Sequence, residues 1–310
     1  MQATLIRGLF LLTLLSFQAS AAELVLQPVK VAPNVYAVIG DLGPQTYANH
    51  GFNNNLGFVV TTDGVLVINS GPSVKVAKTL HAAIQKITKQ PVKWVVNGNS
   101  QSHYWLGNAY FKNLNIPILA HREAGRLMQE MGAAQLQSAK NLLKEQAELT
   151  NLAYPSELLQ DKRSIKLGDT VIEILYFAPA HTAGDMVVWL PQQKVLFAGD
   201  IVFTQRMLGV IPVGNSAGWV KAFDQAMALQ PDVIVPGHGR PTDIRKATRD
   251  TKDYLVYLRS EVKKILDKNG SLQDAVEKID QSKFKYLLNF DLLAKRNVNQ
   301  VYTEMELEAF

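Results

Sequence analysis

Four polar segments of the 310-residue chain carry side chains that could bind a metal ion or move a proton. The first is NGNSQSHYWLGN, residues 97–108, in which amides and hydroxyls surround a single imidazole, that of His103. The other three end apolar runs: His181 in APAHTAGD, Asp200 in LFAGD and His238 in VIVPGHG. Imidazole nitrogen and carboxylate oxygen are the usual ligands of catalytic zinc in sites without cysteine, and this chain has no cysteine. These residues predict either a metal site or the outline of one whose chemistry has been lost.

An apolar, strand-like run precedes each of these segments, at residues 92–96, 170–178, 194–198 and 233–235. Gly or Pro residues after the runs predict turns at the strand ends. Because strand ends meet along one rim of a sheet, we expect His181, Asp200 and His238 to share one cavity beside the loop 97–108. Asn99 and Gln101 in that loop could recognise a ligand or simply satisfy backbone groups in a tight turn.

The elements around these motifs predict two sheets covered by helices. A hairpin signal at Asp63-Gly64 joins two apolar runs. The sequence also predicts helices at 74–87, 217–229 and 247–266, and one long helix or a pair of helices over 124–149. Strand hairpins followed by strand–helix alternation in both halves favour two sheets sandwiched between helices. Since no low-complexity linker divides the chain, we expect one domain over residues 22–245 and a helical C-terminal extension, residues 246–310, packed on it.

The N-terminus has the pattern of a secretory signal peptide over residues 1–21. Arg7 supplies a positive charge, residues 8–17 form an apolar run too short to span a bilayer, and Ala19-Ser20-Ala21 resembles a cleavage site. Cleavage there predicts an exported protein with no membrane attachment, suited to a bacterial periplasm; an uncleaved anchor is the alternative. The net charge of +5 comes from scattered basic residues, which indicates a basic surface and no nucleic-acid partner.

The order of the motifs resembles that of the metallo-β-lactamase superfamily over roughly residues 30–245. The motifs that carry the resemblance are the hairpin DGVLVINSG at 63–71, the loop 97–108, HTAG at 181–184, FAGD at 197–200 and PGH at 236–238. The resemblance implies an α+β protein with a four-layer αββα sandwich. The C-terminal segment 295–306 is similar to the tails of exported members linked to quinoprotein and sulfur-oxidation systems, which would make a periplasmic redox protein a partner.

The first ligand loop departs from the family pattern, which reads H-x-H-x-D-H and reaches Gly-Asn two residues later. Aligned on Gly107-Asn108, this chain differs at every ligand position of that loop, with Asn99, Gln101, His103 and Tyr104 in turn. Asn69 also stands where the family usually has a supporting aspartate. The resemblance therefore implies an altered metal centre.

What remains of the family's ligands implies one zinc ion per chain, or none. The family's first metal position would keep only His181 and Asp200, whereas the second could still be formed by His103, Asp200 and His238. Two imidazoles, one carboxylate and an open position are the minimum of a catalytic zinc site. His181 would then be a catalytic base or a further ligand, and Tyr104 an oxyanion donor or a rare fourth ligand. The alternative for His103 is an ordinary solvated loop histidine.

Three functions stay open on these grounds. The chain could be a periplasmic metal-dependent hydrolase of an ester, thioester, lactone or amide, acting through a reduced single-metal site. It could be a pseudoenzyme that binds a small molecule without a metal. It could also be an accessory protein of a periplasmic redox system. Rapid β-lactam hydrolysis is not expected, because amides replace two ligands of the first metal.

Overall fold

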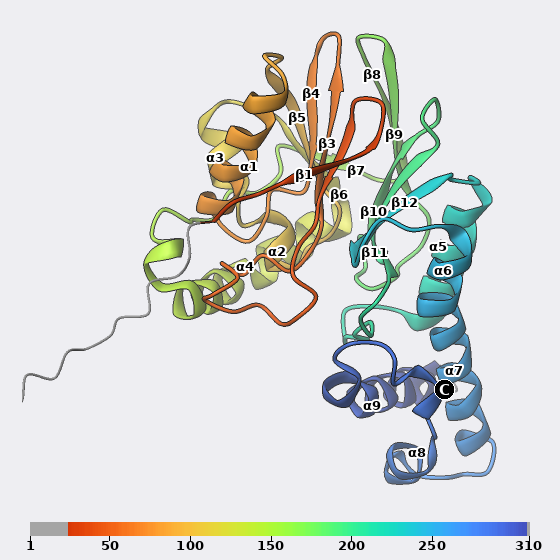
Figure 1. Cartoon of the computed structure of the whole chain (residues 1–310). Coiled ribbons are helices and arrows are strands. Elements are labelled where there is room, and N and C mark those ends of the chain that lie inside the picture. The colour runs from red at the N-terminus through yellow and green to blue at the C-terminus, as the bar shows by residue number, and fades with distance from the viewer. Residues whose placement is uncertain (1–23, 309–310) are drawn as a thin grey trace, which may run out of the picture.

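The computed structural model describes residues 24–308, which fold into two β-sheets packed face to face with helices on both outer sides (Figure 1). The predicted signal peptide, residues 1–21, lies outside the described residues. In spatial order the first sheet contains β1 (Pro28–Ala32), β2 (Val35–Val38), β3 (Leu56–Thr61), β4 (Gly64–Ile68), β5 (Val92–Asn97), β6 (Ile118–His121) and β7 (Glu157–Leu159). The second contains β12 (Val233–His238), β11 (Val195–Phe203), β10 (Met186–Leu190), β9 (Thr170–Tyr176) and β8 (Lys162–Leu167).

Alternating side chains make each sheet bury both of its faces. In β10, Met186 and Val188 point into the core between the sheets, while Val187 and Trp189 point to the helices outside. The period of two in the strand sequence therefore fixes which side chains reach each layer. On the other sheet, Phe58 packs outward against the helix residues Leu80 and Ile84. The predicted four-layer αββα arrangement is confirmed.

The helices are placed around this sandwich in chain order. They are α1 (Val74–Ile87), α2 (Ser102–Trp105), α3 (Asn108–Asn113), α4 (Arg122–Leu143), α5 (Ser216–Ala228), α6 (Ile244–Ala247), α7 (Asp253–Leu266), α8 (Leu272–Lys278) and α9 (Phe290–Glu308). Figure 1 shows α1 and α3 outside the first sheet and α5 and α7 outside the second. None of the helices described between residues 24 and 308 is long and apolar enough to cross a membrane.

Several element boundaries differ from those predicted. The segment 124–149, expected to be one long helix or a helix pair, contains α4, which ends at Leu143, and a short 3₁₀ helix over Lys144–Ala147; Lys144 between them has a positive φ of 52°. The helix expected over 247–266 is interrupted by a π-helical turn, Thr248–Lys252, before α7. Residues 102–113 form two short helices, α2 and α3, and Gly107 between them lies so close to Ser70 that a Cβ there would be 2.1 Å from the carbonyl oxygen.

The C-terminal helices share one apolar core with the second sheet. Tyr254 and Leu258 of α7 and Val298 of α9 are fully buried in the cluster that also contains Trp189 and Leu196. Leu288, which precedes α9, also forms an isolated bridge with Arg206 in the loop that follows β11. This extension therefore supports the strand that carries Asp200 and the loop beyond it.

Candidate functional site

Reciprocal amide hydrogen bonds set the shape of the loop 97–108. The side chains of Asn97 and Asn108 exchange hydrogen bonds of 3.0 and 2.8 Å and are fully buried. Oδ1 of Asn69 accepts a further bond of 2.8 Å from the backbone N–H of Gly98. Both ends of the loop are thereby held, and its middle, residues 99–104, faces the second sheet.

Asp200 is the centre of the site. Its Oδ1 accepts a 2.7 Å hydrogen bond from the hydroxyl of Tyr104, and its Oδ2 accepts one of 2.9 Å from the amide nitrogen of Asn99. Nε2 of His238 lies 3.4 Å from Oδ1, and Nε2 of His181 lies 3.7 Å from Oδ2. The structure thus brings together side chains that are far apart in the chain, and Asp200 is only 1% exposed.

The sequence predicted Asp200 at the end of its strand, but in the structure Asp200 lies within β11. β11 continues through it to Phe203, because the ladder with β12 shifts register near Gly199, whose φ is +52°. This bulge bends the strand and points the carboxylate at the loop 97–108. Gly237 completes the cradle, since a Cβ there would lie 2.1 Å from Oδ1 of Asp200.

The backbone holds His238 in one tautomer. Its Nδ1 lies 2.6 Å from the carbonyl oxygen of Asn53, and a carbonyl only accepts, so Nδ1 carries the proton. Nε2 therefore presents a lone pair toward Asp200. The ring also stacks on Phe203, with centroids 4.8 Å apart. A fixed tautomer and a fixed ring plane are typical of a histidine that is held for metal binding.

His103 completes a group of three potential ligands. Its ring lies 5.6 Å from that of His238, and its buried Nε2 has no hydrogen-bond partner. One ligand atom from each of His103, Asp200 and His238 lies within 4.8 Å of the others. An unpartnered buried nitrogen is costly unless something else binds it. The donor set and this orphaned atom fit a zinc-class ion.

The family's other metal position does not fit a metal here. Nε2 of His181 donates a 2.9 Å hydrogen bond to the amide oxygen of Gln101, so the nitrogen nearest to Asp200 is occupied. Asn99 turns an N–H, and no lone pair, toward the carboxylate. His181 accordingly lies outside the three-ligand group, on the opposite side of Asp200.

Burial controls the protonation of the cluster. It lowers the pKa of His103 to about 4 and that of His238 to about 3, against the opposing charge of Asp200. It also lowers the pKa of His181. Burial pushes the pKa of Asp200 upward, but the three imidazoles outweigh it and the net shift is downward. At neutral pH the site holds neutral imidazoles and one carboxylate.

Tyr104 keeps its proton in this environment. Burial raises the pKa of its phenol well above the usual value, and the negative charge of Asp200 raises it further. The side chain is fully buried, with its hydroxyl on the carboxylate. Tyr104 is therefore a neutral hydrogen-bond donor to Asp200 in this arrangement.

Sequence reasoning missed two features of the site. Asn53 belongs to the run Asn53-Asn54-Asn55, which no motif connects with the site, yet its carbonyl fixes the tautomer of His238. Arg206, in the loop after β11, places a guanidinium nitrogen 3.2 Å from Nδ1 of His238. No motif marks Arg206, because only the folded loop brings it to the cluster.

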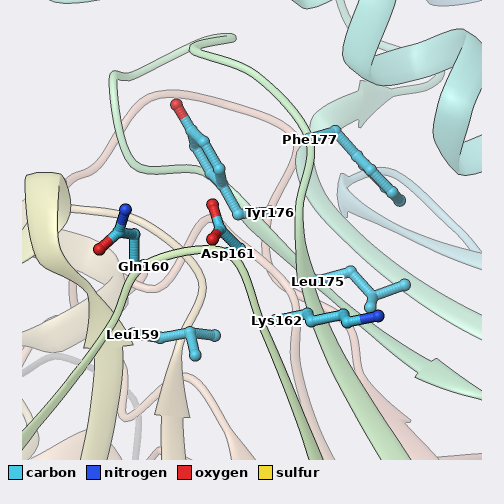
Figure 2. Close-up of a pocket in the computed structure, with 7 residues that line it drawn as sticks. All are labelled: Leu159, Gln160, Asp161, Lys162, Leu175, Tyr176 and Phe177. Atoms are coloured by element: carbon cyan, nitrogen blue, oxygen red, sulfur yellow. The ribbon is translucent and has the colours of Figure 1, made fainter.

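A hollow lies apart from these residues, between the β7–β8 connection and the end of β9. It encloses about 390 Å³ and is lined by Leu159, Gln160, Asp161, Lys162, Leu175, Tyr176 and Phe177 (Figure 2). Tyr176 stacks on His121 with ring centroids 3.8 Å apart, and His121 bonds the carbonyl of Gln160 at 2.7 Å. This histidine has a structural role.

A family model described as the metallo-beta-lactamase superfamily matches residues 50–238, which include the whole cluster. The chain belongs to this superfamily. A linear primary-alkylsulfatase from a Pseudomonas species is 20% identical in an alignment of 283 positions that covers 77% of this chain and 53% of that protein. A Bacillus cereus metallo-beta-lactamase type 2 is 24% identical over 59% of this chain and 66% of its own length.

Another relative, the chicken acyl-coenzyme A thioesterase MBLAC2, is 28% identical over 33% of this chain and 38% of that protein. The chain spans about half, or less, of the first curated relatives that it matches. Among solved structures, a metallo-beta-lactamase from Pontibacter korlensis has a TM-score of 0.59 and 22% identity, covering 72% of this chain and 95% of its own. These structural likenesses show the fold.

Proposed function

We propose that this member of the metallo-β-lactamase superfamily is a hydrolase with a single metal position formed by His103, Asp200 and His238. One observation carries the proposal: one ligand atom from each of the three side chains lies within 4.8 Å of the others. The buried Nε2 of His103, which has no hydrogen-bond partner, supports it. Both imidazoles are neutral at physiological pH, because burial lowers their pKa values. They need not lose a proton to bind a cation.

The surrounding residues have separate roles in this proposal. A zinc ion held there would supply a Lewis acid and lower the pKa of nearby water to about 7. Tyr104 orients the carboxylate of Asp200 and can donate a hydrogen bond to an oxygen that gains negative charge. His181 is the imidazole of the cluster left outside the metal position and can relay a proton.

The proposed substrate contains an ester, thioester, lactone or amide bond. Relatives named as a thioesterase, an alkylsulfatase and β-lactamases support a hydrolytic reaction at this fold. Rapid β-lactam hydrolysis is not part of the proposal, because the first metal position is lost. The signal-like residues 1–21 support export to a periplasm, and the tail 295–306 supports a redox partner there.

Metal analysis of the full chain purified without chelator tests the proposal. We expect about one equivalent of zinc per chain, its loss in His238→Ala, and its retention in the control His81→Ala. His81 is a half-buried helix residue that bonds Tyr110 away from the site. A correctly folded wild-type protein that stays metal-free after zinc supplementation would refute the single-metal site.

A second candidate function is that of a pseudoenzyme that binds a small molecule or a redox partner without a metal. The observation that favours it is that both oxygens of Asp200 already accept hydrogen bonds, from Tyr104 and Asn99. Metal-free wild-type protein that still binds a ligand, without hydrolysing a panel of esters and thioesters, would select this candidate.

A further inference from the structure

The ring of Phe203, at the end of β11, contacts the imidazoles of both His181 and His238. It stacks on His238 at an interplanar angle of 23°, and its centroid lies 5.6 Å from that of His181. The side chain is only 2% exposed. Trp219 of α5 completes this aromatic wall, with its ring 5.1 Å from that of His181 and 5.9 Å from that of Phe203. The orientation of both imidazoles therefore depends on where Phe203 is held.

The backbone of Phe203 is held by a side chain of the C-terminal extension. Its N–H donates a 3.0 Å hydrogen bond to Oγ1 of Thr251, and the same hydroxyl donates one of 2.6 Å to its carbonyl oxygen. β10 pairs with β11 only over residues 195–197, so β10 offers Phe203 no partner. Thr251 is fully buried, and its hydroxyl supplies the two bonds that a neighbouring strand would otherwise make.

Thr251 lies in the π-helical turn Thr248–Lys252, between α6 and α7. Such turns are rare and often occur at functional sites. Consecutive side chains of a regular helix point about 100° apart. Here two consecutive side chains reach the same stretch of backbone, since Asp250 accepts a 3.1 Å bond from the N–H of Gln205 while Thr251 bonds Phe203. The irregular turn therefore fastens the segment that follows Asp200.

A displacement of Phe203 would reach His238 through its ring and through its backbone. The hydrogen bond to the carbonyl of Asn53 and the stacking on Phe203 orient the imidazole. Phe203 and His238 are also paired in the β11–β12 ladder, and the N–H of Thr204 donates to the carbonyl of His238 at 3.0 Å. Because metal–ligand distances tolerate deviations of only about 0.2 Å, a small movement of the ring weakens binding.

We propose that Thr251 is a positioning residue of the metal site, which acts through Phe203 to hold His238 in the orientation that presents its Nε2. The C-terminal extension is then a working part of the site as well as a cover for the second sheet. The inference rests on the proposed function, since it deepens the assignment of His238 as a ligand. Residues that orient a ligand from outside typically change metal affinity by roughly 10- to 100-fold when they are substituted.

Zinc affinity of the full chain, measured by competition with a chelator, tests the role of the hydroxyl. Thr251→Val keeps the branched shape without the hydroxyl, and we expect it to weaken zinc binding by about tenfold or more. Thr251→Ser keeps the hydroxyl and should bind zinc nearly as tightly as the wild type. The matched control is Thr248→Val in the same turn, because the hydroxyl of Thr248 bonds the carbonyl of Ile244 within the helix. Wild-type affinity in folded Thr251→Val would overturn the inference.

A double-mutant cycle shows whether Thr251 acts through Phe203. Phe203→Leu removes the stacking and should weaken zinc binding by itself. Combined with Thr251→Val, it should cost less than the sum of the two single losses, because both substitutions remove the same support. Visible absorption of the cobalt(II)-substituted protein should change in both single variants and stay unchanged in Thr248→Val. Additive losses would contradict an effect through Phe203. If Thr251→Val does not fold, the smaller Thr251→Ala takes its place in each measurement.

A further measurement needs no metal. NMR spectroscopy of the nitrogen-labelled, metal-free protein distinguishes the Nδ1–H from the Nε2–H tautomer of each histidine. Wild type and Thr248→Val should show His238 as Nδ1–H alone, whereas Thr251→Val should add a second set of His238 signals, because the freed ring can leave the carbonyl of Asn53. That result would support the positioning role even if the wild type bound no zinc and the proposed function failed. Unchanged His238 signals in Thr251→Val would contradict it.

Discussion

The side-chain nitrogen of Asn99 donates a hydrogen bond of 2.9 Å to Oδ2 of Asp200. A histidine in this position, as in the family pattern, would offer a lone pair to a metal ion. The amide instead offers an N–H to the same carboxylate. The altered loop therefore has a hydrogen-bonded network where the family pattern has one metal position, and His103, Asp200 and His238 remain as three potential ligands at the other.

Restoring the family's ligands in the loop 97–108 should restore the metal position at which Asn99 and Gln101 replace histidines. We predict that the combined exchange Asn99→His, Gln101→His, His103→Asp and Tyr104→His raises the zinc content from about one to about two equivalents per chain. The reason is that His181, Asp200 and His238 already lie where the restored side chains would meet them. Metal analysis with circular dichroism checks the outcome. A folded variant with one equivalent or less would show that the backbone of the loop 97–108 has also changed.

A negative charge introduced at position 99 should test the hydrogen-bonded network around Asp200 in the metal-free protein. Asn99→Asp places a second carboxylate against Asp200, and we expect a loss of about 2 kcal/mol of unfolding free energy at pH 7 from like-charge repulsion in a buried site. The loss should shrink as pH falls, because one of the two carboxyl groups then takes up a proton. Asn99→Ala is the control: it removes the hydrogen bond without adding charge, so its cost should change little with pH. Urea unfolding in chelator measures both.

The buried imidazoles should make the metal-free protein acid-labile. His103 has a folded pKa of about 4 and His238 one of about 3, both below the ordinary 6.5. Between pH 6.5 and 4 the unfolded chain binds these protons and the folded protein does not, so stability falls as pH decreases. Each of the two imidazoles lowers the unfolding free energy by up to about 3 kcal/mol as the pH falls through this window.

The measurement is urea unfolding across pH 4 to 7 with chelator, compared with His103→Gln. That variant should lose part of the slope, because one of the two buried imidazoles is gone. An unchanged slope would show that His103 titrates normally in the folded state.

The apolar patterning of this sequence predicted the layers, because alternation in strands such as β10 and helical spacing in α1 are local properties of the chain. The convergence of His181, Asp200 and His238 was also predictable, since each follows an apolar strand run. The register of the altered loop could be fixed on Gly107-Asn108, and in the structure Asn99 and Tyr104 both reach Asp200.

Other features depend on contacts that no local pattern encodes. The extension of β11 past Asp200 results from a bulge that only the pairing with β12 defines. The tautomer of His238 depends on the carbonyl of Asn53, and backbone carbonyls leave no trace in a sequence. Arg206 reaches the site because residues near Leu288 hold its loop.

Asn297 of α9 bonds the loop that follows Arg206, and we expect this contact to stabilise the protein. Its buried side chain accepts a 2.8 Å bond from the N–H of Val210 and donates one of 2.8 Å to the carbonyl of Leu208 and one of 3.0 Å to the hydroxyl of Tyr254. Asn297→Leu leaves the N–H of Val210 and the carbonyl of Leu208 without this partner, while the hydroxyl of Tyr254 keeps its bond to Gln281, and we expect a loss of about 2 to 4 kcal/mol of unfolding free energy. The control, Asn299→Leu on the exposed side of α9, should change it by less than about 0.5 kcal/mol.

Because Val210 and Leu208 lie in the same loop as Arg206, whose Nη1 is 3.2 Å from Nδ1 of His238, Asn297→Leu should also lower the zinc content at temperatures where the variant is still folded. Metal analysis of the variant beside Asn299→Leu measures this effect. If Asn297→Leu lost stability but kept the full zinc content, the loop at Arg206 would be held by Leu288 and Asp250 alone, and the support from α9 would end at Val210.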